Sequence, residues 1–112
     1  MLIIDGIIEK IDNKIKINEP FFEVEAEDMH ISPGWLDLHA RMGEPGFEYR
    51  ETIKTGLQAA AKGGFTGVVL MPSTHPPIET KSDINFIVGK GANHIVDIFP
   101  TGCITKKCEQ KE

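Results

Sequence analysis

The part of the chain that follows Pro33-Gly34 alternates between short apolar strands and amphipathic helices. We predict strands over residues 35–39, 65–71 and 94–99, one helix over 49–62, and a second from the Thr80 cap to just before Gly89. The run Val68-Val69-Leu70 is apolar on both faces, which is typical of a buried parallel strand. A strand-helix-strand-helix-strand order joins parallel strands by helical crossovers. The sequence therefore predicts an α/β fold.

The first 32 residues show a different pattern, rich in turns and short alternating runs. Asp5-Gly6 separates Leu2-Ile3-Ile4 from the apolar run over 7–11, which predicts a β-hairpin. Alternation over 15–17 and 22–26 predicts two further strands that bury one face each. We therefore expect two domains, with short antiparallel strands in residues 1–32 and the strand-helix units in residues 33–112.

Charge and composition exclude several classes of protein. The formal net charge is −5 and no basic block occurs, so the chain has no electrostatic footprint for nucleic acid. No apolar run approaches the roughly 20 residues that span a bilayer, and the N-terminus lacks a signal-peptide pattern, so no membrane is expected. Cys103 and Cys108 alone make a weak zinc pattern and a poor disulfide framework. We expect two free thiols in a cytoplasmic protein.

The position of each histidine along the predicted strands separates candidate ligands from structural residues. In a parallel unit the chemistry lies at the carboxyl ends of the strands. His39 ends the first strand and His75 follows the second, so both are candidate metal ligands, with a hydrogen-bonded structural histidine as the alternative. His94 begins the third strand, at the opposite end, and His30 precedes the unit. We expect structural roles for these two.

The segment Asp37-Leu38-His39-Ala40-Arg41 carries two conflicting signals. Alternate side chains of a strand share a face, so Asp37, His39 and Arg41 are expected to point the same way. A histidine at the loop end of a strand suits a metal ion. A guanidinium is always cationic and offers no lone pair, so Arg41 does not. His39 therefore favours a metal site in this segment, and Arg41 counts against one.

Several separated motifs together resemble one family. They are Pro33–His39, Glu44–Thr52, Thr55-Gly56, Ala59–Ala61, Gly63–Thr66 and Met71–Thr74. With these motifs the chain resembles the N-terminal part of the dihydroorotases, in the amidohydrolase superfamily. The resemblance implies a (β/α)8 TIM-type barrel, here its first β/α units, preceded by strands of a small β-sandwich. It also implies hydrolysis of the cyclic amide of dihydroorotate, the reverse closure of carbamoyl aspartate in pyrimidine synthesis, and zinc that activates a water.

The chain departs from the motifs of that family at the residues that carry its chemistry. His39 matches the first zinc ligand, but Arg41 stands where the second histidine is expected. Gly43 replaces the arginine that binds the substrate carboxylate, and Ser73 replaces the asparagine of the loop after the second strand. One interpretation is a metal site that is weakened or absent. The other is that Arg41 binds the substrate carboxylate from a shifted position, while a single remaining metal ion is held by other ligands. Arg41 and Ser73 are the candidate substrate-binding residues.

The length of the chain limits what it can do alone. A (β/α)8 barrel takes roughly 250 residues, and residues 106–112 read as the start of a further helix. We therefore expect an incomplete barrel that is inactive by itself. Three hypotheses stay open: a segment of an active dihydroorotase or a related allantoinase or hydantoinase, a segment of a silent homologue that serves as a scaffold for aspartate carbamoyltransferase, or a small α/β binding module. A homo-oligomer is compatible with the first two.

Overall fold

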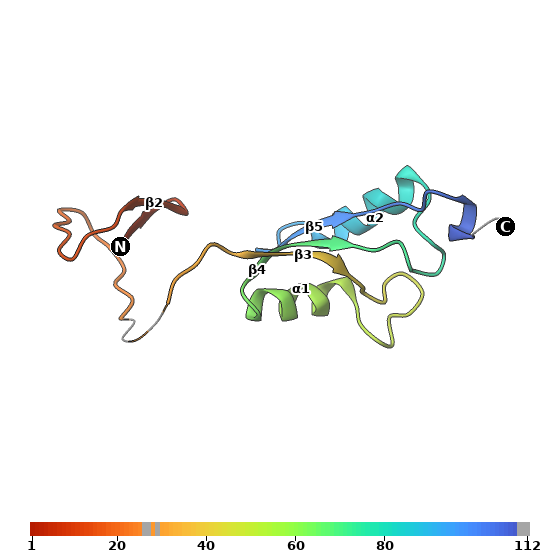
Figure 1. The fold of residues 1–112 in the computed structure, drawn as a ribbon, viewed down its shortest axis with the longest axis horizontal. Helices are drawn as coiled ribbons and strands as arrows, with labels where there is room; N and C mark the ends of the chain where they lie inside the picture. The colour runs from red at the N-terminus through yellow and green to blue at the C-terminus, as the bar shows by residue number, and fades with distance from the viewer. Residues whose placement is uncertain (26–27, 29, 110–112) are drawn as a thin grey trace. The chain divides into compact units, whose positions relative to one another are not determined.

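The computed structural model describes residues 1–25, 28 and 30–109, which fall into two compact units, Met1–Ile31 and Ser32–Glu112 (Figure 1). In the first unit, β1 (Leu2–Ile4) pairs with β2 (Ile7–Lys10) in an antiparallel sheet. Asp5 and Gly6 both have positive φ, +50° and +80°, as a tight hairpin turn requires. The predicted hairpin is confirmed.

The prediction of two further strands in the first unit is wrong for the residues that the structure describes. Residues 15–17 and 22–25 lie outside any strand, and Ala26 lies outside the described part of the chain. Phe22 and Val24 are 91% and 67% exposed. Alternation supplies an apolar face, but a strand also needs a hydrogen-bonding neighbour, and a lone hairpin offers little surface to pack on.

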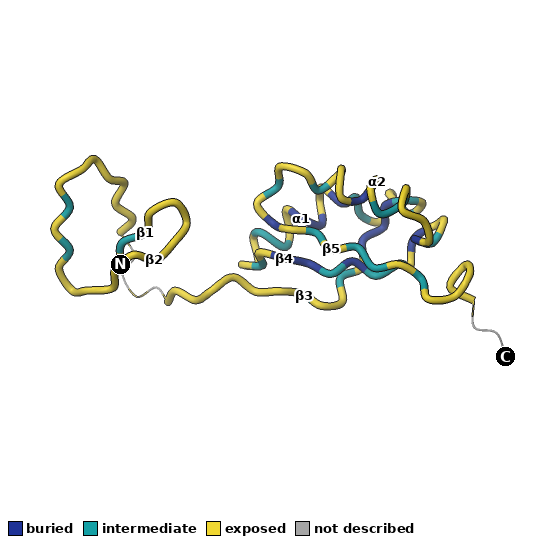
Figure 2. The backbone as a smooth tube through the Cα atoms, turned by 90° about the horizontal axis from the view of Figure 1, so that it is seen from above, coloured by how far each residue is buried: buried dark blue, intermediate teal, exposed yellow. Residues whose placement is uncertain are grey.

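The second unit is a three-stranded parallel sheet with two crossover helices, as predicted. Its strands are β3 (Trp35–Ala40), β4 (Phe65–Leu70) and β5 (Asp97–Pro100), in the order β3-β4-β5. The third strand begins at Asp97 and not at His94 as predicted, because His94 lies in the turn after α2. The helices α1 (Ile53–Lys62) and α2 (Lys81–Gly91) contact each other and lie on the same face of the sheet (Figure 2). The fold class is therefore α/β.

Both helices differ from the prediction at one end. α1 begins at Ile53, not at residue 49, because Thr52 caps it through a reciprocal bond pattern with Thr55. α2 continues through Gly89 to Gly91 instead of stopping before Gly89. Its cap is the predicted pair, with the Asp83 N–H donating to Thr80 and the Thr80 N–H donating to the Asp83 carboxylate at 2.8 Å. The predicted cap of α2 is thus confirmed, whereas the cap of α1 at Thr52 was not predicted.

The end of the described chain corrects two further expectations. The helix predicted from residue 106 is absent from the described residues 106–109, where Lys106–Cys108 is a single 3-10 turn (η1) and Lys107 has a φ of +56°. Residues 110–112 lie outside the described part of the chain. Cys103 and Cys108 are joined in a disulfide and are not free thiols. Their Cα atoms lie 5.2 Å apart, inside the range that a disulfide bridges.

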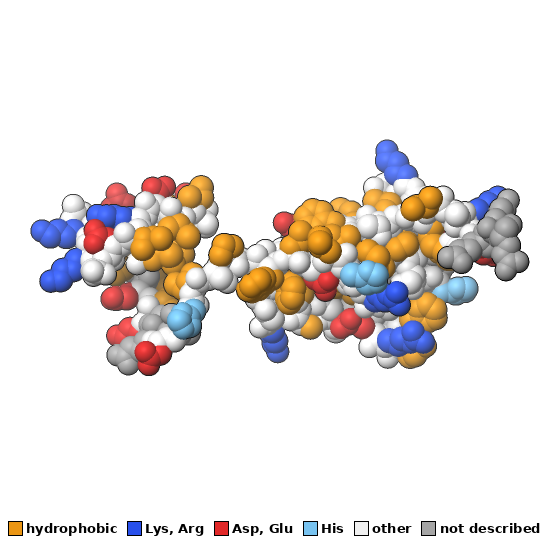
Figure 3. Space-filling model, in the orientation of Figure 1, with side chains coloured by type: hydrophobic (Ala, Val, Ile, Leu, Met, Phe, Trp, Pro, Cys, Tyr) orange, Lys and Arg blue, Asp and Glu red, His pale blue; other side chains and the backbone are white. Residues whose placement is uncertain are grey.

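The core of the second unit lies between the sheet and its two helices. Figure 2 shows buried segments, in dark blue, in both the helices and the sheet. The most deeply buried side chains, each at most 1% exposed, are Ile53, Leu57, Leu70, Ile78, Ile87 and Val96. The opposite face of the sheet is open, with Leu36 and Phe99 about half exposed, and apolar side chains gather over this region in Figure 3. Among the described residues, no helix has the length and apolar character to cross a bilayer.

Candidate active site

A cavity of about 330 Å³ lies between β3 and α1, and its lining extends from Phe65 at the start of β4 to the polar side chains of the predicted segment near the end of β3. Asp37, His39 and Arg41 line it, and Glu51, which lies just before α1, lines its other side. Met42 and Val68 belong to its apolar lining. The three residues that the sequence predicts to share a face therefore do meet in one cavity.

The strand that carries these residues is not regular. Its register against β4 shifts between Asp37 and Ala40, so three residues of β3 advance past two of β4. The backbone N–H of His39 donates to the Asp37 carboxylate at 2.8 Å within this irregular stretch. Bulges of this kind change the direction in which a side chain points and are common beside active sites. His39 and Arg41 are both exposed at the cavity.

The donor set around His39 does not fit the zinc site that the resemblance implies. His39 supplies one imidazole, and the Asp37 carboxylate already accepts a hydrogen bond from the backbone N–H of His39. Arg41 adds five N–H donors, no lone pair and a positive charge that repels a dication. Among the residues that the structure describes, no three His, Cys, Asp or Glu side chains form a group that could hold a metal ion. The cavity instead offers a cation for an anionic group and two carboxylates for N–H donors.

Gly43, two residues past Arg41, lies in a turn that leaves no room for a side chain. Its carbonyl accepts the Phe47 N–H at 2.6 Å. A Cβ at residue 43 would lie 2.7 Å from the Glu51 carbonyl oxygen and closer still to that of Phe47. An arginine therefore cannot stand at Gly43 unless this loop changes its conformation.

Glu44 holds the same loop against both helices, a role that the sequence analysis missed. Its side chain is 9% exposed, accepts the Ile53 N–H at 3.0 Å at the start of α1, and pairs with the Lys90 ammonium at 2.8 Å. A carboxylate is favourable at a helix N-terminus because free N–H groups and the helix dipole meet there. The distance of nine residues between Glu44 and Ile53 hides this cap from any local pattern.

The loop after β4 joins the loop after β3 through His75. The His75 N–H donates to the Pro45 carbonyl at 3.0 Å, and its ring centroid lies 6.1 Å from that of Phe47. Ser73 is exposed and does not line the cavity that holds Arg41. Beside Phe47, Glu48 accepts the Gly46 N–H at 2.9 Å, and this bond lowers the pKa of the Glu48 carboxyl.

The remaining histidines lie away from this site. The His94 Nδ1 accepts the Val96 backbone N–H at 3.1 Å just before the amino end of β5, and His94 does not line the cavity. This bond is the structural role predicted for it. His30 is exposed and belongs to the other compact unit.

Parallel strands with helical crossovers define an α/β domain, and a cavity with Asp37, His39, Arg41 and Glu51 lies beside its strand β3. Residues 29–112 match the family described as Dihydro-orotase-like. The chain is 38% identical over 107 residues to a dihydroorotase of Citrifermentans bemidjiense, which covers 95% of the chain and 25% of that relative. It is 37% identical over 113 residues to the dihydroorotases of Caldanaerobacter subterraneus and Aquifex aeolicus, which covers all of the chain and 26% of each. The chain belongs to the dihydroorotase family and spans about a quarter of the length of these relatives.

Proposed function

We propose that the chain forms the first β/α units of a cytoplasmic, dihydroorotase-like cyclic amidohydrolase, which interconverts dihydroorotate and carbamoyl aspartate in pyrimidine synthesis. In this proposal residues 1–32 contribute strands to a small β-sandwich, and residues 33–112 begin a (β/α)8 barrel. Family membership and the parallel β3-β4-β5 sheet support it. The exposed apolar face with Leu36 and Phe99 supports further barrel strands packing there.

The observation that carries the proposal is the position of Arg41 beside His39 in the cavity at the end of β3. Arg41 binds the substrate carboxylate, because a planar guanidinium can donate two parallel hydrogen bonds to it. The closed turn at Gly43 favours this assignment over a clamp two residues later. Asp37 and Glu51 accept hydrogen bonds from substrate N–H groups. Ser73 lies outside this cavity, so its contact with the substrate requires the loop after β4 to move toward Arg41.

In the 112-residue chain by itself these residues bind and orient without turnover. His39 is the position at which the family motif would place a metal ligand, and zinc in the family supplies Lewis-acid activation of water. The donors around His39 do not fit that ion, so we assign no step to it here. The isolated chain accordingly has no hydrolase activity.

Binding and turnover can be tested separately on the same chain. Carbamoyl aspartate should perturb the guanidinium resonances of Arg41 in an NMR titration, and Arg41→Gln should abolish the effect. Arg50→Gln is the matched control, because Arg50 stacks on Phe47 and Tyr49 and does not line the cavity. Equal binding by Arg41→Gln would refute the role of Arg41. Zinc-dependent hydrolysis of dihydroorotate by the isolated chain would refute its inactivity.

A second candidate is a silent homologue that acts as a scaffold for aspartate carbamoyltransferase. Arg41 in place of a ligand and the closed turn at Gly43 favour it, since both changes work against metal chemistry while the fold is kept. Co-elution of the chain with aspartate carbamoyltransferase in size-exclusion chromatography tests it, and a homo-oligomer would appear in the same experiment. Separate elution of the two proteins at micromolar concentration would rule this candidate out.

A further inference from the structure

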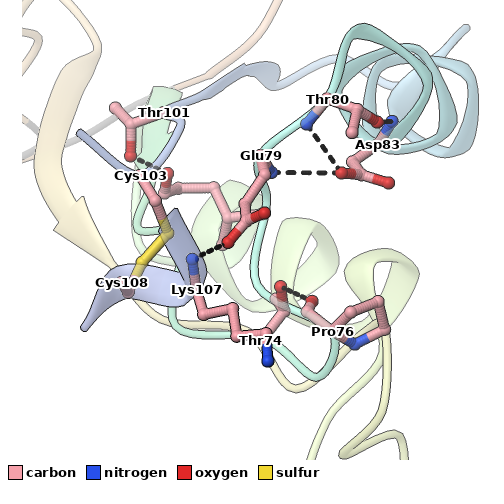
Figure 4. The surroundings of a disulfide bond; sticks show 10 residues. Thr74, Pro76, Glu79, Thr80, Asp83, Thr101, Cys103, Lys107 and Cys108 are labelled. Atoms are coloured by element: carbon pink, nitrogen blue, oxygen red, sulfur yellow. Dashed lines mark hydrogen bonds between the residues drawn. A yellow bond between two sulfur atoms is a disulfide. The ribbon is translucent and has the colours of Figure 1, made fainter. Parts of the chain in front are cut away.

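The Cys103–Cys108 disulfide closes a short loop after β5 (Figure 4). These are the two cysteines of the chain, so the bond is intramolecular. Cys103 is half-buried and Cys108 is exposed. The bond is therefore accessible to reductants in solution.

The loop rests on the segment that follows β4. The Thr101 N–H and hydroxyl both donate to the Leu70 carbonyl, at 2.9 and 2.8 Å, and the Cys103 N–H donates to the Ile78 carbonyl at 2.8 Å. Farther along the loop, the Lys107 N–H donates to the Glu79 carboxylate, which Figure 4 shows beside the disulfide. The bonds of Thr101 and Cys103 lie before or at the first cysteine, whereas the bond of Lys107 lies inside the loop.

We propose that Cys103 and Cys108 are a redox-responsive clamp, which holds the loop against Glu79 when oxidised and releases it when reduced. A low-molecular-weight disulfide such as oxidised glutathione is the oxidant. The Cys108 thiolate attacks one sulfur of that disulfide and expels one glutathione thiolate. The Cys103 thiolate then attacks the Cys108 sulfur of the mixed disulfide and expels the second. Both protein thiols are oxidised, one glutathione disulfide is reduced to two thiols, and the protons pass to the leaving thiolates.

Reduction should act on one end of the loop only. Cutting a disulfide loop of six residues removes a chain-entropy constraint that corresponds to roughly fortyfold in the population of the open loop. The backbone bonds of Thr101 and Cys103 do not depend on the disulfide and should persist. The contact of Lys107 with Glu79 should loosen. This inference rests on the loop alone and does not require the proposed function.

Equilibration of the 112-residue chain with defined mixtures of reduced and oxidised glutathione tests the proposal. Cβ chemical shifts of both cysteines and differential alkylation with mass mapping should show a reversible change between dithiol and intramolecular disulfide. Amide exchange of Lys107 should accelerate by roughly fortyfold on reduction, while the amide of Leu70 stays protected. Cys103→Ser should give the reduced-state exchange under all conditions. Glu79→Gln is the matched control, because it weakens the contact and keeps both thiols.

Three outcomes would overturn the clamp. They are a dithiol that persists in excess oxidised glutathione, oxidation that yields only mixed or intermolecular disulfides, and equal exchange of the Lys107 amide in the oxidised and reduced chain.

Discussion

Replacing Glu44 by alanine should detach the loop after β3 from the start of α1. The substitution leaves the Ile53 N–H, on a residue that is 0% exposed, without its charged acceptor. A hydrogen bond to a charged group contributes about 1.5–3 kcal/mol, and this range includes the benefit of a carboxylate at a helix N-terminus. The Lys90 ammonium is half exposed and regains water, so its pairing adds less than about 1 kcal/mol. We expect a loss of about 2–3 kcal/mol in the free energy of unfolding.

The assay is urea unfolding of the chain followed by far-ultraviolet circular dichroism. Glu44→Gln should cost about 1 kcal/mol, because an amide oxygen can still accept the Ile53 N–H without the charge. Glu48→Ala is the matched control: it lies in the same loop but is exposed, and it should cost clearly less than Glu44→Ala. If Glu44→Ala unfolds at the same urea concentration as Glu48→Ala, the reasoning about a buried helix cap is refuted.

Three further predictions concern the core, a turn and a cap. Leu57→Ala should lower the free energy of unfolding by about 3 kcal/mol in urea, because Leu57 is 1% exposed; a loss below about 1 kcal/mol would contradict the packing described. Gly43→Arg should destabilise the chain by about 1–3 kcal/mol in the same assay and should not strengthen carbamoyl aspartate binding, since the turn has no room for a Cβ; unchanged stability would show that the loop adapts. Hydrogen bonds from the backbone N–H groups of Thr80 and Glu79 lower the pKa of the Asp83 carboxyl in the folded chain. Ionised Asp83 therefore stabilises the fold fully above the ordinary aspartate pKa of about 3.9, and this stabilisation disappears as the pH falls through the lower folded pKa. Asp83→Asn should flatten the stability profile in that acidic range, and an unchanged profile would contradict the assignment.

Local sequence signals predicted much of the second unit. The order of its strands and helices, the parallel pairing and the cap at Thr80 follow from periodicity, crossover rules and residues within one helical turn of each other. The same signals failed at residues 15–17, because a strand exists only with a hydrogen-bonding neighbour, and alternation does not reveal whether one is present.

The sequence by itself determined the family resemblance, the α/β order and the meeting of Asp37, His39 and Arg41 at the end of one strand, since all of these depend on residues close together in the chain. Only the tertiary structure decided that Glu44 caps a helix nine residues away, that a Cβ at residue 43 would meet two backbone carbonyls, and that Cys103 and Cys108 pair. The physical reason is that these contacts depend on the path of the folded backbone, which brings together atoms that no local sequence pattern pairs. Local periodicity and capping signals therefore do not reveal them.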